Sequence, residues 1–334
     1  MYNKTILDRV LETKDDLLNL PRNRMLEIGA SVLFLFMITQ GRRTWLNILN
    51  FSLFLEAINY TLFPQNLGFW VHGELDETHL LLTRFLGLLC ITWTFGYFVL
   101  SKSTDSTTET SYLLGYTVML VSSLMAKGYL MTHPSKKSAV KIESDDMNSI
   151  FFITLLFAVG SLFFTVKSND WGGFGEQQSH ANFHLRLQFV LLLVMGILFY
   201  TMPSWTVKMM SMNVEKVDTV HAFLARANGT MLLGMAIVAN RAANFLRPAE
   251  KDILVFSQWL FFVLFSLLGW IDTAGRWATL PWSRVAIQAT HDAVIILNAT
   301  GALNRDFSVV KRSVIPRFKA VPQDVRNLFK FKKM

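Results

Sequence analysis

The stretch that decides the fold is SIFFITLLFAVGSLFFTV, residues 149–166, which contains no charged side chain. A helix needs about 20 predominantly apolar residues to cross the hydrocarbon core of a bilayer. Similar blocks recur along the chain, which is 52% hydrophobic and only 17% charged over its 334 residues. A membrane-spanning barrel would instead show alternating segments of about ten residues. The sequence therefore predicts an all-α integral membrane protein.

Eight blocks are long and apolar enough to be predicted as transmembrane helices. Short connections containing Pro or Gly separate several of them, as at Phe63-Pro64. The single cysteine, Cys90, lies inside one block, so no disulfide can form within the chain. The predicted spans are Thr44–Phe63, His79–Leu100, Ser111–Met131, Ser149–Val166, Phe183–Met202, Val220–Ala239, Ile253–Ile271 and Ser283–Leu303.

Two N-terminal segments are predicted to lie outside these spans. Residues 5–20 place apolar side chains near one helical face, which indicates an amphipathic helix or a surface helix that rests on the protein. Residues 26–40 contain Glu27 and are flanked by Arg24 and by Arg42-Arg43. This segment is short for a span, so we expect an interfacial helix in the membrane plane or a segment that dips into the membrane.

The basic residues of the two tails predict the orientation. Residues 1–43 hold seven Lys and Arg residues and residues 304–334 hold nine. Because cytosolic segments carry the excess of Lys and Arg, both termini are expected in the cytosol, which requires an even number of spans. Lys136, Lys137 and Lys141 would then lie on the lumenal side and argue against this orientation. The net charge of +8 indicates affinity for anionic lipid headgroups rather than for nucleic acid.

The two halves of the chain share a pattern. His79, Arg84 and Gly87 open the second predicted span with the spacing His-x4-Arg-x2-Gly, and His221, Arg226 and Gly229 open the sixth with the same spacing. We interpret the halves as a duplicated four-span unit with parallel orientation, because four spans return the chain to the same side. The predicted divisions are an N-terminal arm (1–43), a first unit (44–166), a cytosolic linker (167–182), a second unit (183–303) and a basic tail (304–334).

The first unit resembles a known family. Arg43-Thr44-Trp45, an apolar run, Phe63-Pro64 and then Arg84-x2-Gly87 are similar to the single four-span unit of the p53-inducible protein 11 family. The resemblance covers roughly residues 43–132, and the second unit departs from it because Met202-Pro203 replaces Phe-Pro. It implies a small endoplasmic-reticulum or endosomal membrane protein without catalysis, and it supplies no active site.

Charged residues inside the spans need partners, because an unpaired charge in the membrane is costly. Glu56 and Arg84 lie at similar depths on neighbouring spans, so the sequence predicts an ion pair between them. For Arg226, the carboxylate at matching depth is Asp292 on the eighth span. These pairs would fix helix packing or, alternatively, line a polar cavity for a proton or a lipid headgroup.

The sequence predicts no catalytic, cofactor-binding or metal-binding residues, and an enzyme is not expected. A haem or quinone oxidoreductase ranks third among the functions considered, because the histidines do not form depth-matched pairs on facing spans. Lys330 and Lys332, near the C-terminus, form a Lys-x-Lys-x-x sequence that resembles a dilysine retrieval signal of the endoplasmic reticulum. The alternative is a Lys-rich end that binds acidic lipid.

The leading prediction is therefore a non-enzymatic, multi-pass accessory or scaffold subunit of an endoplasmic-reticulum membrane complex. A complex that transfers lipids at membrane contact sites would be a suitable host. The expected partners are membrane lipids and a larger membrane-protein complex, for example one containing a lipid-transfer protein, and not nucleic acid. The alternative is a transporter or scramblase-like conduit for lipids or small solutes that uses the intramembrane ion pairs.

Overall fold

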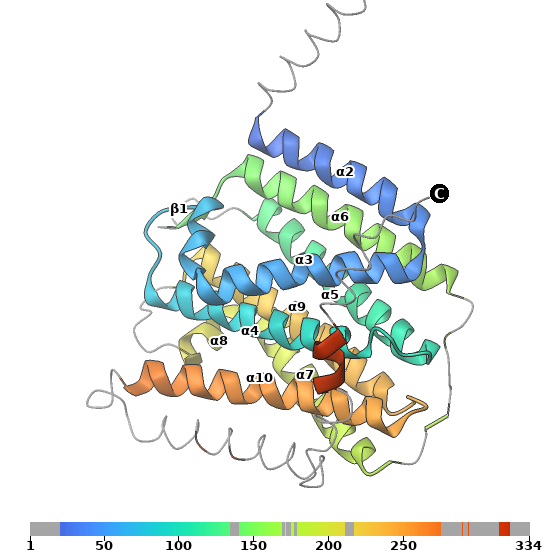
Figure 1. The fold of residues 1–334 in the computed structure, drawn as a ribbon. Helices are drawn as coiled ribbons and strands as arrows, with labels where there is room; N and C mark the ends of the chain where they lie inside the picture. Colours follow the sequence, from blue (N-terminus) through green and yellow to red (C-terminus); the bar gives the residue numbers. More distant parts are fainter. Residues whose placement is uncertain are drawn as a thin grey trace, which may run out of the picture.

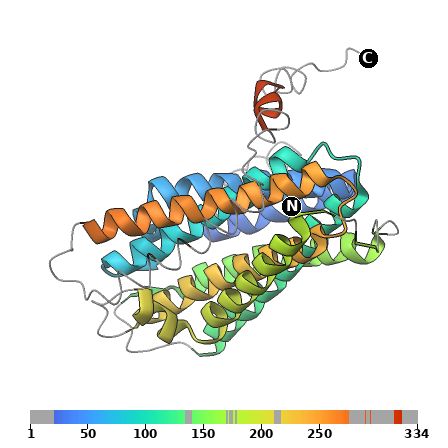
Figure 2. The same ribbon diagram turned by 90° about the horizontal axis from the view of Figure 1, so that it is seen from below.

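The computed structural model shows a bundle of long helices (Figures 1 and 2). It describes residues 21–133, 140–168, 179–210, 217–274 and 314–320, together with a few single positions between them. The helices are α2 (Arg22–Gln40), α3 (Arg42–Leu62), α4 (Glu77–Leu100), α5 (Ser106–Thr132), α6 (Ser144–Lys167), α7 (Ala181–Thr201), α8 (Pro203–Met210), α9 (Thr219–Ala242) and α10 (Pro248–Ala274). A 3-10 helix, η1 (Pro64–Phe69), and two short strands, β1 (Val71–His72) and β2 (Lys141–Ile142), lie in connections.

The predicted all-α membrane architecture is confirmed. Six helices are long and apolar enough to cross a bilayer, namely α4, α5, α6, α7, α9 and α10. Each corresponds to a predicted span. The first predicted span forms α3, which is long enough but carries Asn47, Asn50, Glu56 and Asn59 and is not among these six. The eighth predicted span, 283–303, lies outside the described residues except for two single positions.

Helix α2 differs from the expected interfacial helix. It begins at Arg22, is 19 residues long and packs along α6 (Figure 1). Its outward face carries exposed apolar side chains, among them Val32, Leu35 and Phe36. A helix lying in the membrane plane would present a polar outer face, so of the two predicted alternatives this arrangement fits a segment that dips into the membrane better than an interfacial helix.

Trp45 fixes the contact among α2, α3 and α6. Its fully buried indole packs edge-on against Phe34 of α2 and donates a hydrogen bond of 3.1 Å to the Ser161 hydroxyl of α6. Gly160 makes room for the indole, because a Cβ at this position would lie 2.0 Å from a Trp45 ring carbon. The tryptophan that follows Arg43-Thr44 in the sequence is therefore a packing residue.

Helices α4 and α9 form the centre of the bundle. In the most apolar 18-residue stretch of each helix, 67% is buried inside the bundle, compared with 28% in the corresponding stretch of α7. Helix α4 contacts α3, α9 and α10, whereas α9 contacts α7, α4 and α5. The third long helix of each half, α5 or α10, thus packs against the central helix of the other half (Figure 1). Among the described residues, the helices of the two halves are therefore interlocked and do not pack as separate bundles.

Several of the segments that connect the helices meet at one end of the bundle. The segment between α3 and α4 pairs with the segment between α5 and α6 through the antiparallel strands β1 and β2. Pro64 prevents α3 from continuing, and Asp76 caps the start of α4. The first turns of α4 and α9 meet at this end, where their capping residues are in contact.

Candidate functional site

The same capping arrangement begins α4 and α9. Asp76 Oδ1 accepts a hydrogen bond of 2.9 Å from the backbone N–H of His79, and Asp218 Oδ1 accepts one of 2.8 Å from that of His221. In each case the histidine side chain lies close to the backbone N–H of the capping aspartate, at 3.3 Å in α4 and 3.4 Å in α9. Both helices therefore start with a capping box in which histidine takes the usual place of Glu or Gln.

The two caps also contact each other, and together form the Asp/His quartet (Asp76, His79, Asp218 and His221). His79 Nε2 lies 3.2 Å from an Asp218 carboxylate oxygen, and His221 Nε2 lies 3.1 Å from Asp76 Oδ1. The imidazole rings stack with their centroids 3.6 Å apart. Because each carboxylate contacts histidines from both halves, the quartet links the halves across the centre of the bundle.

Both carboxylates of the quartet are held in the charged form. Burial raises the pKa of Asp218, but hydrogen bonds from His221 and His79 outweigh it and hold this pKa well below its usual range. Burial acts on Asp76 in the same way, and the His79 backbone N–H together with the charge of His221 lowers the pKa of this carboxyl. Two anions at the starts of α4 and α9 also suit the positive ends of the helix dipoles.

Each imidazole of the quartet lies between two carboxylates. His79 Nδ1 lies 2.9 Å from Asp76 Oδ1, and His221 Nδ1 lies 3.1 Å from Asp218 Oδ1. Each ring therefore has a carboxylate oxygen near both nitrogens, and a carboxylate only accepts hydrogen bonds. The backbone N–H groups of Asp76 and Asp218 also point to Nδ1 of His79 and His221, so each imidazole contacts both hydrogen-bond donors and acceptors.

Metal binding fits the quartet less well. The possible ligand atoms of Asp76, His79 and His221 all lie within 4.8 Å of one another. A metal ion must lie in the plane of each imidazole that binds it, whereas these two rings stack at an angle of 21°. A second possible group contains His72, Glu143 and Asp146, but Asp146 already pairs with Arg22 at 2.7 Å. Neither group offers an unengaged set of ligands.

The predicted Glu56–Arg84 ion pair does not form. Arg84 is exposed, and no carboxylate among the described residues pairs with it. The side of α3 that faces α4 carries Ala57 and Thr61, which places Glu56 about 100° away around the helix. Glu56 instead interacts electrostatically with Lys127 of α5. Adjacent spans and equal depth were therefore insufficient to identify the partner.

Arg226 contacts an aromatic ring. Its guanidinium carbon lies 4.6 Å from the centroid of Tyr129 of α5, which is a cation–π contact. The predicted partner of Arg226, Asp292, lies outside the described residues, as do Lys330 and Lys332 of the proposed retrieval signal.

Gly87 and Gly229 have the same structural role in the two halves. A Cβ at Gly87 would lie 2.7 Å from the backbone nitrogen of Thr61 in α3. A Cβ at Gly229 would lie 2.8 Å from the backbone nitrogen of Tyr200 in α7. Both glycines therefore allow a central helix to approach its outer neighbour closely, as small residues do between membrane helices.

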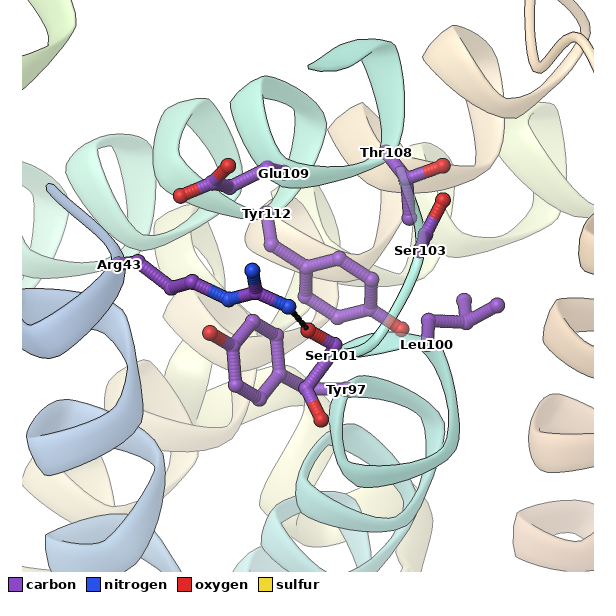
Figure 3. A pocket seen from close by; sticks show the side chains of 8 residues that line it. All are labelled: Arg43, Tyr97, Leu100, Ser101, Ser103, Thr108, Glu109 and Tyr112. Carbon is purple, nitrogen blue, oxygen red and sulfur yellow. Dashed lines mark hydrogen bonds between the residues drawn. The ribbon is translucent and has the colours of Figure 1, made fainter. Parts of the chain in front are cut away.

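A small polar pocket lies at the other end of the bundle (Figure 3). Arg43 points into it and donates a hydrogen bond of 2.5 Å to the Ser101 carbonyl just after α4. Tyr97 donates to Asn47 at 3.0 Å, and Glu109 pairs with Arg42 at 3.1 Å. These contacts stabilise the end of α4 and leave few polar groups for a ligand. The lining residues are Arg43, Tyr97, Leu100, Ser101, Ser103, Thr108, Glu109 and Tyr112.

The sequence-based interpretation missed three functional candidates. Asp76 and Asp218 extend the repeated pattern to Asp-x2-His-x4-Arg-x2-Gly, so comparison of the two halves a few residues further back would have found them. Lys127 lies inside a predicted span, where any charged residue is a signal. Its interaction with Glu56 required the three-dimensional arrangement.

Comparison with known proteins gives one family match. Residues 50–294, which cover most of the chain, match a family described as a domain of unknown function (DUF8292). No curated protein and no solved structure matches the chain. The resemblance to the p53-inducible protein 11 family therefore stays a prediction.

Proposed function

The chain belongs to the DUF8292 family, and we propose that it is a non-enzymatic scaffold, an accessory subunit of a larger complex in the endoplasmic-reticulum membrane. The interlocked packing of its two halves is the observation that carries this proposal. An accessory subunit has to present fixed surfaces to its partners, and interlocked helices provide them.

The packing of α5 and α10 opposes relative movement of the halves. A Cβ at Gly115 of α5 would lie 3.0 Å from the carbonyl oxygen of Gly234 in α9, so the two backbones are in close contact. At the end of the bundle the Asp/His quartet adds polar links between α4 and α9. A transporter that rocks one repeat against the other would have to break these contacts. The geometry therefore favours a static role.

The proposed topology has eight spans in two parallel four-span repeats. The matching caps of α4 and α9, which begin at the same end of the bundle, support a duplication with like orientation. Eight spans would leave both termini in the cytosol, where the part of the arm that precedes α2 and the tail over 304–334 are available for docking. Lys330 and Lys332 would return the protein to the endoplasmic reticulum, and a lipid-transfer protein at a contact site is the partner that we propose.

Native purification combined with crosslinking tests the scaffold proposal. We expect a stoichiometric companion protein whose crosslinks reach the cytosolic arm or tail. Recovery of the full chain alone from several detergents would contradict the proposal. In intact cells, replacement of Lys330 and Lys332 by Ser should move the protein out of the endoplasmic reticulum, whereas replacement of Lys311 and Arg312 should not.

A conduit for lipids or small solutes is the second candidate function. The observation that favours it is the presence of two groups of opposite charge, Glu56 on α3 and Lys127 on α5, within the predicted spans. In proteoliposomes, Glu56→Gln and Lys127→Gln would then abolish flux of a labelled lipid without changing assembly. The scaffold proposal expects no protein-dependent flux from the wild-type chain.

A further inference from the structure

A small cavity lies between α4, α5, α9 and α10, inside the apolar part of the bundle. Trp93 lies seven residues before Leu100, the last residue of α4, and Gln258 lies ten residues after Pro248, the first residue of α10. At about 1.5 Å per residue, these positions are about 10 and 15 Å from the helix ends. All of the residues that line the cavity are buried. Helices from both halves of the chain thus enclose it.

Two of the lining side chains have a buried polar atom without a hydrogen-bond partner. Trp93 Nε1 of α4 is a donor and Gln258 Oε1 of α10 is an acceptor, and neither forms a hydrogen bond with the described residues. Trp93 is 3% exposed and Gln258 is 1% exposed, so neither atom is hydrated from the surface of the bundle. A buried polar atom without a partner is destabilising. A donor and an acceptor that line one cavity therefore indicate a polar ligand between them.

Gly96 keeps space open beside two hydroxyl groups of this cavity. A Cβ at this position would lie 2.7 Å from the Tyr112 hydroxyl of α5 and 3.0 Å from the Ser257 hydroxyl of α10. Both residues line the cavity. The Ser257 hydroxyl donates a hydrogen bond of 2.8 Å to the Leu254 carbonyl, so its oxygen can still accept one. Tyr112 also lines the polar pocket at the end of the bundle, so the two spaces share this side chain (Figure 3).

The size of the cavity and the chemistry of its lining limit what can bind. The free space has room for about one water molecule, which is too little for a lipid headgroup or an acyl chain. No charged side chain among the described residues lines it, so it does not suit an ion. Water both donates and accepts hydrogen bonds, and a buried water molecule typically makes about three of them.

We propose that this cavity binds a single water molecule that joins the two halves of the protein. The water accepts a hydrogen bond from Trp93 Nε1 of α4 and donates one to Gln258 Oε1 of α10. The hydroxyl groups of Tyr112 and Ser257 supply further polar contacts beside it. The water thereby adds a polar connection between α4 and α10 at a depth where no bulk water competes. This site goes beyond the proposed scaffold function and requires neither a partner protein nor transport.

A structure of the wild-type full chain that resolves ordered water tests the proposal directly. We expect a density peak within hydrogen-bond distance of both Trp93 Nε1 and Gln258 Oε1. The Trp45 indole is the control, because it is also buried but donates directly to Ser161 at 3.1 Å, so no peak is expected between them. An empty cavity with clearly resolved side chains would overturn the proposal. A Trp93 indole that instead donates directly to Gln258, or to the hydroxyl of the neighbouring Tyr116, would also overturn it.

Two substitutions test the same site through stability. Gly96→Ala places a methyl group beside the hydroxyls that border the water, and Gln258→Leu removes the acceptor at similar side-chain size. We expect each to lower the Tm of the full chain in detergent. In the Gln258→Leu background, the decrease caused by Gly96→Ala should be about half as large, because the water is then already lost. An equal decrease in both backgrounds would mean that Gly96 only avoids a steric clash, and would contradict the proposal.

Gly196→Ala is the matched control for these variants. A Cβ at Gly196 of α7 would meet the Leu233 side chain at 3.0 Å, and neither residue lines the cavity. Its effect on Tm should therefore be the same with and without Gln258→Leu, and a reduction as large as that for Gly96→Ala would contradict a local water site. If a variant fails to fold, the wild-type density alone decides. Because no companion protein is needed, the outcome is separate from that of the scaffold experiment.

Discussion

The first turns of α4 and α9 are alike, whereas the charged residues just below them differ. Both helices begin with an Asp–His cap, and both use a glycine to approach an outer helix. Below the caps, Arg84 is exposed and pairs with no carboxylate among the described residues, while Arg226 packs on Tyr129. The features that both halves share make the same helix contacts, whereas the two arginines differ in what they contact. This contrast indicates that the common framework is structural, because the residues that both halves share make the same kinds of helix contact.

The largest effect is expected from the glycines of this common framework. Gly229→Val would drive a side chain into the backbone of α7, where Tyr200 N and Gly196 O lie 2.8 and 2.9 Å from the new Cβ. Because backbone atoms cannot move aside easily, we expect a loss of about 3 kcal/mol or more. Gly128→Val is the control, since its Cβ would meet a single ring carbon of Phe151 at 3.6 Å. Thermal unfolding in detergent measures both, and equal Tm values would contradict the close approach.

Substitution of the two aspartates of the quartet should lower the stability of the protein to different extents. The Asp218 side chain is 11% exposed and that of Asp76 is 51% exposed. Asn still caps a helix, so Asp→Asn removes the charge but keeps the cap. We expect Asp218→Asn to cost about 2 kcal/mol and Asp76→Asn less than about 1 kcal/mol, because water screens the more exposed group. Equal losses of unfolding free energy would show that the two caps are equivalent.

The effect of Asp218→Asn should depend on pH. The pKa of Asp218 is lowered in the folded protein, so its contribution to stability is complete above the ordinary aspartate pKa of about 4 and is lost as pH falls towards the folded pKa. The difference in Tm between the wild type and Asp218→Asn should therefore be present at pH 6 and shrink below about pH 4. A difference that grows with acidification would contradict the assignment of a stabilised carboxylate.

The smallest effects on stability are expected from substitutions of the two arginines, Arg226 and Arg84. Arg226→Ala removes the contact with the Tyr129 ring and should cost about 1 kcal/mol. Arg84→Ala should change stability by less than about 0.5 kcal/mol, because no described residue pairs with its guanidinium. Tyr129→Leu should lower stability by about as much as Arg226→Ala, and the double variant should show that the two losses are not additive. Additive losses would mean that the cation–π contact is not energetically important.

Much of the fold could be predicted because membrane spanning is a local requirement. Length and apolar composition are enough to identify a helix such as α6, whose 24 residues carry no charge between Asp146 and Lys167. The caps are local as well, since Asp76 and His79 are three residues apart on the same turn. The repeated spacing of His79, Arg84 and Gly87 drew attention to the starts of α4 and α9, where the structure places matching caps and glycines, whereas the duplicated four-span unit stays a prediction.

Tertiary structure alone decided which helix faces touch. Hydropathy does not specify how a helix is rotated about its axis, so Glu56 was assigned to Arg84, with which it forms no ion pair in the structure. It also could not show that α5 packs on α9 and α10 on α4. Lipid is as apolar as the helix surfaces, so burial gives membrane helices little reason to choose one neighbour over another. Close-approach glycines and polar contacts such as the Asp/His quartet make that choice, and they act only when distant segments meet.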